Sequence, residues 1–391
     1  MFGWEYPPAH LGGLGVACQG IVRGLLHHGA EVTLVLPHDE GVEDGVRVIH
    51  PTSEGPVIRV PSALKPYDSF TSFSSRRTFS SSGIDQLYGS NLGDEVERFT
   101  NMAVDMTKDL HPDIIHAHDW MTFEAARRSA EYHNKPFVAH IHATELDRTE
   151  YNPHPWIFEK ELEGLLAADH IITVSNYTKQ LLIREYGIRE DKVTVLHNGT
   201  SEQPLSQPIA MHHKRHPLVL FLGRLTVQKG AKYFLKAAQA VVKAMPAARF
   251  VIAGDGYLLP ELINDSIDMD LADHVMFAGK VCSEEAMKLY QKASCFVMPS
   301  VSEPFGLVAL EAITHGAPVI LSKQSGASEV VHNALTVDFW DTEKMADCIL
   351  TVLREEPLQN EMRSHSPAIL RRLTWNNQAR KMIDLYKKIM Q

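Results

Sequence analysis

The stretch CFVMPSVSEPFGLVALEA (295–312) decides the fold. It opens with a short apolar run without polar alternation, which is typical of a strand buried on both faces of a parallel sheet. Pro304 and Gly306 then break the chain, and a second apolar run predicts a helix from about Leu307. Two carboxylates, Glu303 and Glu311, interrupt this apolar unit. Because an unpaired buried carboxylate is costly, Glu311 is expected to have a partner in the protein or in a ligand.

Similar units recur on both sides of this stretch. Apolar runs, each followed by a helical pattern, lie at 31–36, 46–50, 113–118, 136–141, 170–175, 192–197, 217–223, 249–254, 274–279, 318–322 and 334–339. This alternation predicts an α/β fold, with parallel sheets covered by helices. The series breaks once, at residues 198–217, which are polar and hold three prolines. The break predicts a linker between two Rossmann-like domains.

The chain length supports this division, because 391 residues exceed one ordinary core. We predict a first domain over 1–199, a linker over 200–217 and a second domain over 218–372. The segment 373–391 contains an amphipathic helix. Its apolar residues near one face are Trp375, Ala379, Met382, Ile383 and Tyr386.

The composition excludes several classes of protein. A net charge of -10 argues against a nucleic-acid binder, which normally carries a basic surface. The four cysteines show no CxxC spacing, so neither a zinc knuckle nor a disulfide framework is indicated. The first ten residues lack the features of a signal peptide, and no run is long enough to span a bilayer. We therefore expect a cytoplasmic protein.

Two loops at expected strand ends carry features that suit a phosphate ligand. In FLGRLTVQKG (221–230), a glycine is followed by Arg224 and Lys229, which could clamp a diphosphate or could be ordinary surface cations. In SKQSGASEVV (322–331), small residues precede a helix expected near Ser328, so backbone amides could bind an anion. A simple serine cap of that helix is the alternative.

The position of the two glutamates narrows the question of their partners. Glu303 and Glu311 can face one crevice at the strand ends, beside both loops. Carboxylates accept hydrogen bonds from vicinal hydroxyls, so one could bind a ribose and the other a sugar. A helix-dipole contact for Glu303 and an internal salt bridge for Glu311 are the alternatives. We favour the ligand interpretation because three separate loops converge on one chemistry.

Histidines mark the corresponding edge of the first domain. In DIIHAHDWM (113–121), His118 and Asp119 end a buried strand. The pairs His116/His118 and His140/His142 could build a zinc site on neighbouring strands, and a metal-dependent hydrolase follows from that alternative. We favour a site without metal, in which His142 and Glu145 line the crevice.

Two further segments allow two interpretations each. The glycine-rich HLGGLGVACQG (10–20) precedes and begins a helix. It could bring backbone amides to a phosphate or sugar ligand, or it could be a tight turn with close helix packing. The Ser-rich stretch 69–83, which includes Arg76 and Arg77, is expected to be a surface loop. A flap that covers a cleft and binds a substrate is the functional alternative.

The order GRLTVQKG, AGDGY, EPFGLVALEA, SGASEVV resembles the donor domain of retaining family 4 glycosyltransferases of the GT-B fold. The resemblance includes two glutamates separated by seven residues. The first half, with GWEYPPAHLGGLG and IIHAHDW, is similar to bacterial glycogen and starch synthases and their relatives. The resemblance implies two domains facing a central cleft, with the C-terminal helix crossing back to the first domain.

The resemblance also implies roles for residues. Arg224 and Lys229 would hold the diphosphate in place of a metal, Glu311 the ribose, Glu303 the transferred sugar, and His118 would lie near the reacting centre. No cofactor is implied beyond the nucleotide-sugar co-substrate. The donor site implied is Gly13, Glu303, Phe305, Gly306, Leu307, Glu311, Gly326, Ala327 and Ser328, and the acceptor side is Asp119, His142 and Glu145.

Two departures from the family pattern qualify this assignment. Glycogen synthases carry a lysine two residues before the paired glycines, where this chain has His10. Only Met1 to Gly3 remain for the family's first strand, so this strand is expected to be very short or the recorded start to lie downstream of the true one.

The activity implied is configuration-retaining transfer of a hexose, by resemblance glucose, to a glucan or another carbohydrate. No carboxylate is an evident nucleophile, so front-face attack with the diphosphate as base is expected. A sugar-phosphate acceptor, as in sucrose-phosphate synthases, is the alternative, and a non-catalytic nucleotide-sugar binder is a further one.

Overall fold

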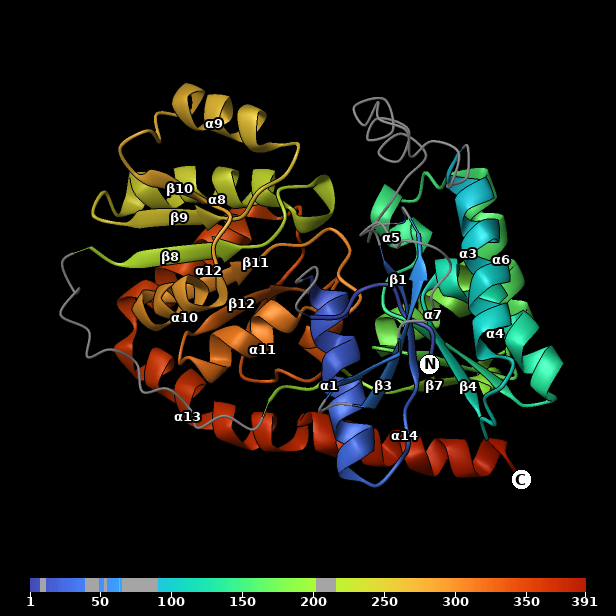
Figure 1. The fold of residues 1–391 in the computed structure, drawn as a ribbon. Coiled ribbons are helices and arrows are strands. Elements are labelled where there is room, and N and C mark those ends of the chain that lie inside the picture. The colour runs from blue at the N-terminus through green and yellow to red at the C-terminus, as the bar shows by residue number, and fades with distance from the viewer. Residues whose placement is uncertain (8–11, 39–48, 53–54, 63, 65–90, 202–215) are drawn as a thin grey trace.

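The computed structural model describes residues 1–7, 12–38, 49–52, 55–62, 64, 91–201 and 216–391, which form two α/β domains lying side by side (Figure 1). His10, the Ser-rich stretch with Arg76 and Arg77, and most of the predicted linker lie outside the described residues. Within these ranges, no helix combines the length and the apolar character needed to cross a membrane.

The first domain is built on one mixed sheet. Its strands are β1 (Leu34–His38), β2 (Ile49–Thr52), β3 (Gly55–Pro61), β4 (Ile115–His118), β5 (Phe137–Ile141), β6 (His170–Thr173) and β7 (Val193–Val195). They run in the order β2-β3-β1 and β4-β5-β6-β7, and all neighbours are parallel except β2 and β3. The helices are α1 (Gly13–His27), α3 (Leu92–Thr107), α4 (Trp120–His133), α5 (Glu145–Thr149), α6 (Pro155–Ala167) and α7 (Asn176–Glu185).

Residues 1–3 join the two groups of strands into one sheet. Phe2 forms parallel bridges to Val35 of β1 and Ala117 of β4. Its N–H donates to His116 O at 2.8 Å, and its carbonyl accepts from His118 N at 3.0 Å. Phe2 therefore takes the place of a strand with a single bridging residue, and it positions the end of β4, where His118 lies.

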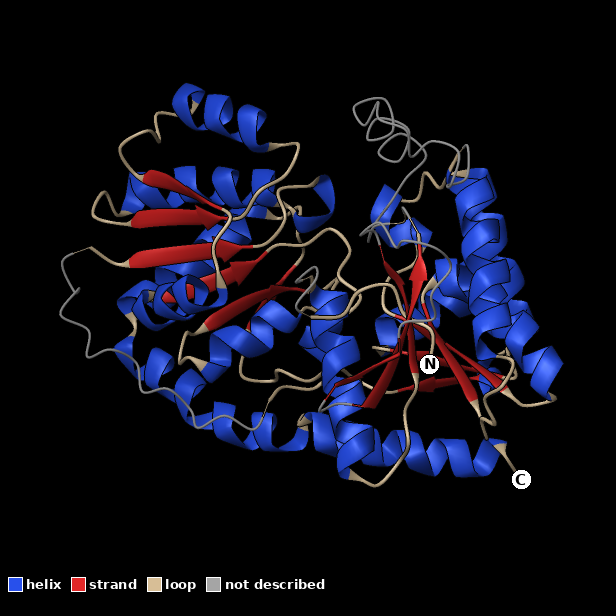
Figure 2. Ribbon diagram, in the orientation of Figure 1, coloured by secondary structure: helices blue, strands red, loops and turns tan. Residues whose placement is uncertain are grey.

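The second domain has a six-stranded parallel sheet. Its order is β10-β9-β8-β11-β12-β13, and the arrows in Figure 2 point toward the first domain. The strands are β8 (Leu218–Leu222), β9 (Arg249–Ala253), β10 (Val275–Gly279), β11 (Cys295–Met298), β12 (Val319–Ser322) and β13 (Leu335–Val337). The helices are α8 (Ala231–Ala244), α9 (Leu259–Asp268), α10 (Ser283–Lys292), α11 (Leu307–Thr314) and α12 (Thr342–Arg354). Strands β8, β11 and β12 are largely buried, as their continuous apolar runs predict.

Two C-terminal helices run beneath both domains (Figure 1). Helix α13 (Glu356–Arg372) leads into α14 (Trp375–Ile389), which packs on α1 of the first domain. The contact is close because α1 presents glycines there: a Cβ added at Gly20 would lie 2.2 Å from the Trp375 ring. The chain passes between the domains twice, near Thr200 and near Thr374, and these two segments are hydrogen-bonded to each other. Thr200 N donates to Leu373 O at 2.6 Å, and Trp375 N donates to Thr200 O at 3.2 Å.

Candidate active site

The loop after β8 carries Arg224 and Lys229, the two cations predicted to hold a diphosphate, and it packs against the end of β11. After β8 come Gly223, the exposed Arg224 and a 3-10 turn over Val227–Lys229. Gly230 follows with φ of +74°, and a Cβ there would lie 1.9 Å from Pro299 O. Only glycine fits this approach, which presses the lysine-bearing turn against the end of β11.

Lys229 and Glu303 form an ion pair at this edge. Lys229 Nζ lies 2.5 Å from Glu303 Oε2, and the side chains are 20% and 8% exposed. Ser300 Oγ donates to the same carboxylate oxygen at 3.2 Å. The partner of Glu303 is therefore a protein cation rather than a helix dipole. Lys229 is itself a predicted ligand-binding residue. A ligand that carries both phosphate and hydroxyl groups could therefore separate the pair, with Lys229 binding the phosphate and Glu303 the hydroxyls.

Glu311 has a different protein partner. It lies in α11, and Tyr290 of the neighbouring α10 donates a hydrogen bond to Glu311 Oε2 at 3.1 Å. Burial raises the pKa of the Glu311 carboxyl. The residue also lines a cavity of about 140 Å³, which it shares with Leu307, His315 and residues of the first domain such as Val16. The protein partner of Glu311 is therefore a tyrosine hydroxyl and not the internal salt bridge that was the alternative to a ligand.

The loop after β12 does not have the free amides expected of it. The helix expected near Ser328 is a 3-10 turn over Gly326–Glu329. Gly326 N donates to Glu303 O, Ala327 N to Phe305 O and Ser328 N to Ser325 O, at 2.9, 2.7 and 3.2 Å. The prediction of free amides was wrong because this loop pairs with the backbone of the β11–α11 connection. The pairing holds Glu303 and Phe305 in place.

Glu329, at the end of this turn, reaches the first domain. Its carboxylate accepts from the N–H groups of Asn176 and Tyr177, at the start of α7, at 2.9 and 2.7 Å. His197 Nε2 lies 3.1 Å from the same carboxylate. Although burial opposes the shift, these hydrogen bonds lower the pKa of Glu329. A second contact joins the domains nearby, where Ser302 Oγ donates to Asp147 Oδ1 at 2.5 Å.

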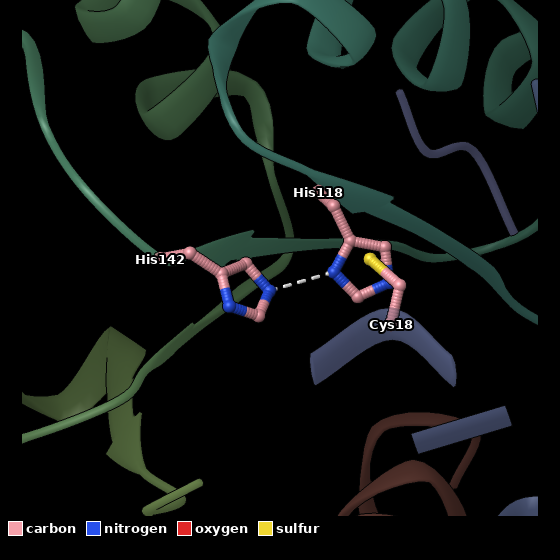
Figure 3. A group of neighbouring side chains, drawn as sticks. All are labelled: Cys18, His118 and His142. Atoms are coloured by element: carbon pink, nitrogen blue, oxygen red, sulfur yellow. Dashed lines mark hydrogen bonds between the residues drawn. The ribbon is translucent and has the colours of Figure 1, made fainter. Parts of the chain in front are cut away.

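Four histidines form a buried ladder in the first domain. His118 of β4 pairs in register with His140 of β5, so alternate residues of both strands share one face. His118 Nδ1 and His142 Nε2 are 2.9 Å apart (Figure 3), and His116 Nε2 and His140 Nδ1 are 3.2 Å apart. His116 Nδ1 also contacts Tyr386 OH of α14 at 2.5 Å. Burial lowers the pKa of all four imidazoles, which are therefore neutral at pH 7.

Asp119, directly after β4, has a strained backbone. Its φ of 59° and ψ of 166° are rare for any residue but glycine and cost about 1–3 kcal/mol. The carboxylate holds this conformation by accepting from His142 N at 2.7 Å and Arg148 Nη2 at 3.2 Å. Such strain concentrates at functional sites. The sequence placed Asp119 at the cleft but carried no sign of the strain.

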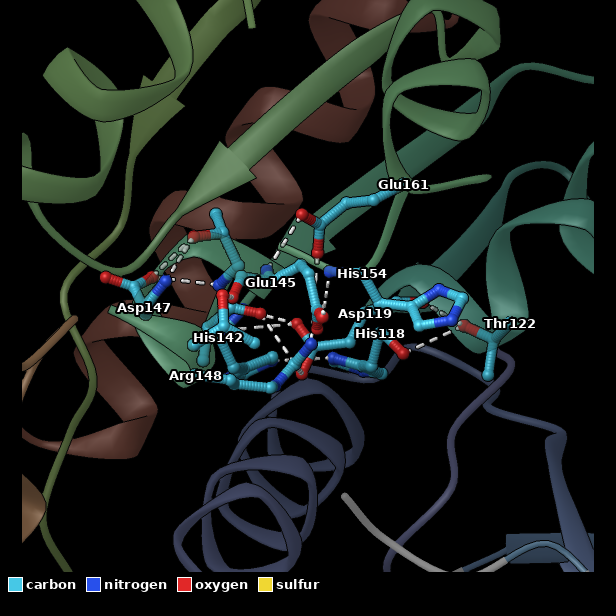
Figure 4. A network of polar contacts seen from close by, with 12 residues as sticks. His118, Asp119, Thr122, His142, Glu145, Asp147, Arg148, His154 and Glu161 are labelled. Carbon is cyan, nitrogen blue, oxygen red and sulfur yellow. Dashed lines mark hydrogen bonds and ion pairs between the residues drawn. The ribbon is translucent and has the colours of Figure 1, made fainter. Parts of the chain in front are cut away.

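A buried acidic network surrounds Asp119 (Figure 4). Glu145, at the start of α5, accepts from His154 N at 3.1 Å and donates its own N–H to Glu161 Oε2 at 2.9 Å. Burial raises the pKa of Glu161 to about 8, against the charge of Arg148. Arg148 and Glu161 were not predicted. In the sequence, Arg148 stands out only as an arginine three residues after Glu145, and Glu161 only as a charge that interrupts an apolar helix pattern.

Glu5 is bound to the backbone at the N-terminus of α1. Glu5 accepts a hydrogen bond from Gly12 N, and burial raises the pKa of its carboxyl while the charge of Arg224 opposes this. Gly13 is exposed and has open space around its α-carbon. Glu5 is a further cleft residue that sequence reasoning missed.

The structure thus gathers the predicted residues in two facing groups. Arg224, Lys229, Glu303 and the start of α11 form one group, and His118, Asp119, His142 and Glu145 form the other. The charged and polar side chains of the two groups are suited to phosphate, sugar and hydroxyl ligands.

Comparisons with known proteins agree over nearly the whole chain. A family model described as glycosyltransferase family 4 matches residues 11–203, and one described as glycosyl transferases group 1 matches residues 204–368. An uncharacterized glycosyltransferase of Methanocaldococcus jannaschii is 28% identical, covering 100% of this chain and 98% of that protein. A glycogen synthase of Mycobacterium tuberculosis is 27% identical over 86% of this chain and 80% of its own length.

Solved structures share the fold. A sucrose-phosphate synthase from Thermosynechococcus elongatus superimposes with a TM-score of 0.78 at 19% identity, covering 99% of this chain and 98% of that one. The catalytic domain of starch synthase IV from Arabidopsis thaliana, bound to ADP and acarbose, has a TM-score of 0.71 at 16% identity, over 100% and 98% of the two chains.

Proposed function

Since the chain is a family 4 type glycosyltransferase with the GT-B fold, we propose that it transfers a hexose from a nucleotide diphosphate sugar to a carbohydrate acceptor with retention of configuration. Glucose is the hexose proposed, and a glucan is the proposed acceptor. The similarity to the glycogen synthase of M. tuberculosis supports both choices.

The observation that carries the proposal is the Lys229–Glu303 pair at the end of β11. In the proposed complex the diphosphate lies against Lys229 and Arg224, and Glu303 turns to hydroxyls of the transferred sugar. The two cations neutralise charge that develops on the leaving diphosphate, a role that divalent metals serve in other transferases. We therefore propose that transfer does not depend on a metal ion.

The rest of the donor is assigned to α11 and the neighbouring loops. Glu311 binds the ribose hydroxyls, Phe305 to Leu307 lie along the donor, and Gly13 admits it from the α1 side. Gly326 and Ala327 act on the donor through the backbone of Glu303 and Phe305, to which their amides are bound. Ser328 belongs to the same turn, where its amide donates to Ser325 O.

The acceptor is assigned to the first domain, beside Asp119, His142 and Glu145, with His118 next to the reacting centre. The carboxylates that face the cleft already have protein partners: Asp119 binds Arg148, and Glu303 binds Lys229. We therefore propose front-face departure and attack, in which the leaving diphosphate takes the acceptor proton.

The test is release of nucleoside diphosphate from UDP-glucose, ADP-glucose and GDP-mannose. Each donor is offered with glycogen, with a sugar phosphate and without acceptor. Release stimulated by glycogen supports the proposal, and an α-anomeric product by NMR supports retention. Release only with a sugar phosphate would move the acceptor to the sucrose-phosphate-synthase type. No release from folded protein under any condition would contradict the proposed donor class, and loss of turnover in EDTA would contradict metal independence.

A further inference from the structure

Cys18, His118 and His142 form a compact cluster at the floor of the first domain's side of the cleft. Cys18 lies on α1, His118 ends β4, and His142 follows β5, so three elements contribute one side chain each. The side chains point toward one another (Figure 3). One ligand atom from each residue lies within 4.8 Å of those from the other two. We call this set the Cys18 cluster.

The cluster holds polar atoms whose hydrogen-bonding capacity is unused. His118 Nδ1 and His142 Nε2 satisfy each other at 2.9 Å. Among the described residues, His118 Nε2 and His142 Nδ1 are buried and have no hydrogen-bond partner. Such orphaned nitrogens are uncommon in a folded protein and call for an explanation, of which an ion that the side chains bind is one.

We propose that the Cys18 cluster is a binding site for a thiophilic transition-metal ion, specifically Zn²⁺. Cysteine sulfur and imidazole nitrogen are both zinc ligands, and a site with three protein ligands leaves a fourth position for water. Tetrahedral zinc places such ligand atoms about 3.3–3.6 Å apart, given Zn–N and Zn–S bonds of about 2.0 and 2.3 Å. The ligand atoms lie within 4.8 Å of one another, so any pair needs to close by at most about 1.5 Å. On binding, the Cys18 thiol releases its proton to water, and His118 and His142 each give one imidazole nitrogen to the ion.

The position of each ligand suits an ion that enters from the cleft. Cys18 and His118 are fully buried, whereas His142 is partly exposed and provides the route of entry. Asp119 lies behind the site, where its carboxylate accepts from His142 N and fixes the segment that carries the imidazole. Metal sites commonly use such outer contacts to orient their ligands.

A second group, His116, His118 and His140, is also close enough to be considered. It suits a metal less well, because both nitrogens of His116 are already hydrogen-bonded, one to His140 and one to Tyr386. It is also fully buried and has no sulfur ligand. This group instead ties α14 to the sheet.

Binding of Zn²⁺ has a consequence for transfer, which rests on the proposed function. A coordinated His118 cannot contact the substrate, so zinc and sugar compete for one side chain. The structure thus favours an inhibitory zinc ion, in contrast to the activating metal of a hydrolase, the alternative raised by the two H-x-H pairs. Transfer should be inhibited by Zn²⁺ and restored by a chelator.

Cobalt titration of the chelator-treated full-length chain tests the site without reference to activity. Co²⁺ replaces Zn²⁺ and gives a thiolate-to-metal absorption band only when a cysteine is bound. We expect one equivalent to bind with this band, Zn²⁺ to abolish it, and Cys18→Ser and His142→Asn to lose it. Cys295→Ser is the matched control, since Cys295 is another buried cysteine, on β11 of the second domain. It should keep the band.

Absence of the band in the wild-type chain, or its persistence in folded Cys18→Ser, would overturn the proposal. Circular dichroism establishes that each variant is folded, and His142→Asn supports the test if Cys18→Ser does not fold. Competition is tested separately: Cys18→Ser should retain transferase turnover and require at least about tenfold more Zn²⁺ for half inhibition. Equal inhibition of both proteins would refute the competition. If no donor gives turnover, the cobalt titration still decides the metal site.

Discussion

Lys229→Ala is the substitution that tests the phosphate assignment most directly. The ammonium lies 2.5 Å from Glu303 and, in the proposed complex, beside the leaving diphosphate. Loss of one preorganised charge-stabilising group costs about 10²–10³-fold in turnover, or about 2.7–4 kcal/mol. A unit charge about 4 Å from a phosphate oxygen, at an effective dielectric of about 20, contributes about 4 kcal/mol. We therefore expect turnover to fall by a factor in this range.

The same substitution should leave the fold intact. Lys229 is partly exposed, and Glu303 keeps the hydrogen bond from Ser300 at 3.2 Å. The loss of stability should be about 1–2 kcal/mol, because one partner of a largely shielded pair remains in place. Thermal unfolding measures this loss and separates it from the loss of turnover.

The assay is nucleoside diphosphate release at saturating donor, and the control is Lys232→Ala. Lys232 is three residues away on α8 and also lies 2.5 Å from a glutamate, Glu261, but this pair is exposed and faces no predicted ligand. Its removal should leave turnover unchanged. Turnover of folded Lys229→Ala within about threefold of wild type, a difference under about 0.7 kcal/mol, would refute the phosphate role.

Three further substitutions test the structure around the site. Gly230→Ala should lower thermal stability far more than Gly29→Ala, because both glycines have positive φ but only Gly230 lacks room for a Cβ; equal losses would contradict the close approach of Gly230 to Pro299. Glu161 has a folded pKa near 8 and an ordinary value of 4.5. The folded chain therefore holds an extra proton between these values, and stability falls by up to about 1.4 kcal/mol per pH unit as pH rises through this window. Urea unfolding of Glu161→Gln between pH 6 and 8 should lack this slope, and parallel slopes for both proteins would oppose the assignment. Glu329→Ala removes the acceptor of the α7 amides across the cleft, so the radius of gyration from X-ray scattering should increase, whereas Glu329→Gln should show a smaller change.

Most of the parallel strands were predictable because burial on both faces leaves a continuous apolar run. The strand β3 was not, since Pro56, Arg59 and Pro61 interrupt its pattern. It forms because β1 offers a parallel edge and β2 pairs with it from the other side. Such pairing is a tertiary effect that local propensity does not report.

The partners of the site residues were harder to predict than the residues themselves. Glu303 and Glu311 were identified by the cost of burying a charge in an apolar segment. Their protein partners are Lys229 and Tyr290, which are 74 and 21 positions away in the chain. The amides of Gly326 and Ala327 were wrongly expected to be free for the same reason, because their acceptors come from the loop that follows another strand, β11. Residue type and spacing identify a group that needs a partner, whereas only the topology supplies the partner.

The histidines show what residue type and spacing predict and what only the topology decides. Two H-x-H pairs on consecutive strands were enough to predict that four imidazoles could share one face, since side chains alternate along a strand. The register His118↔His140 then brings the pairs together. What each imidazole can do depends on a third element that the spacing does not reveal: α14 brings Tyr386 to His116 and satisfies it, while α1 brings Cys18 toward His118 and leaves a nitrogen of His118 unpaired. One end of the ladder is therefore structural, and the other end, which opens to the cleft, retains the capacity to bind.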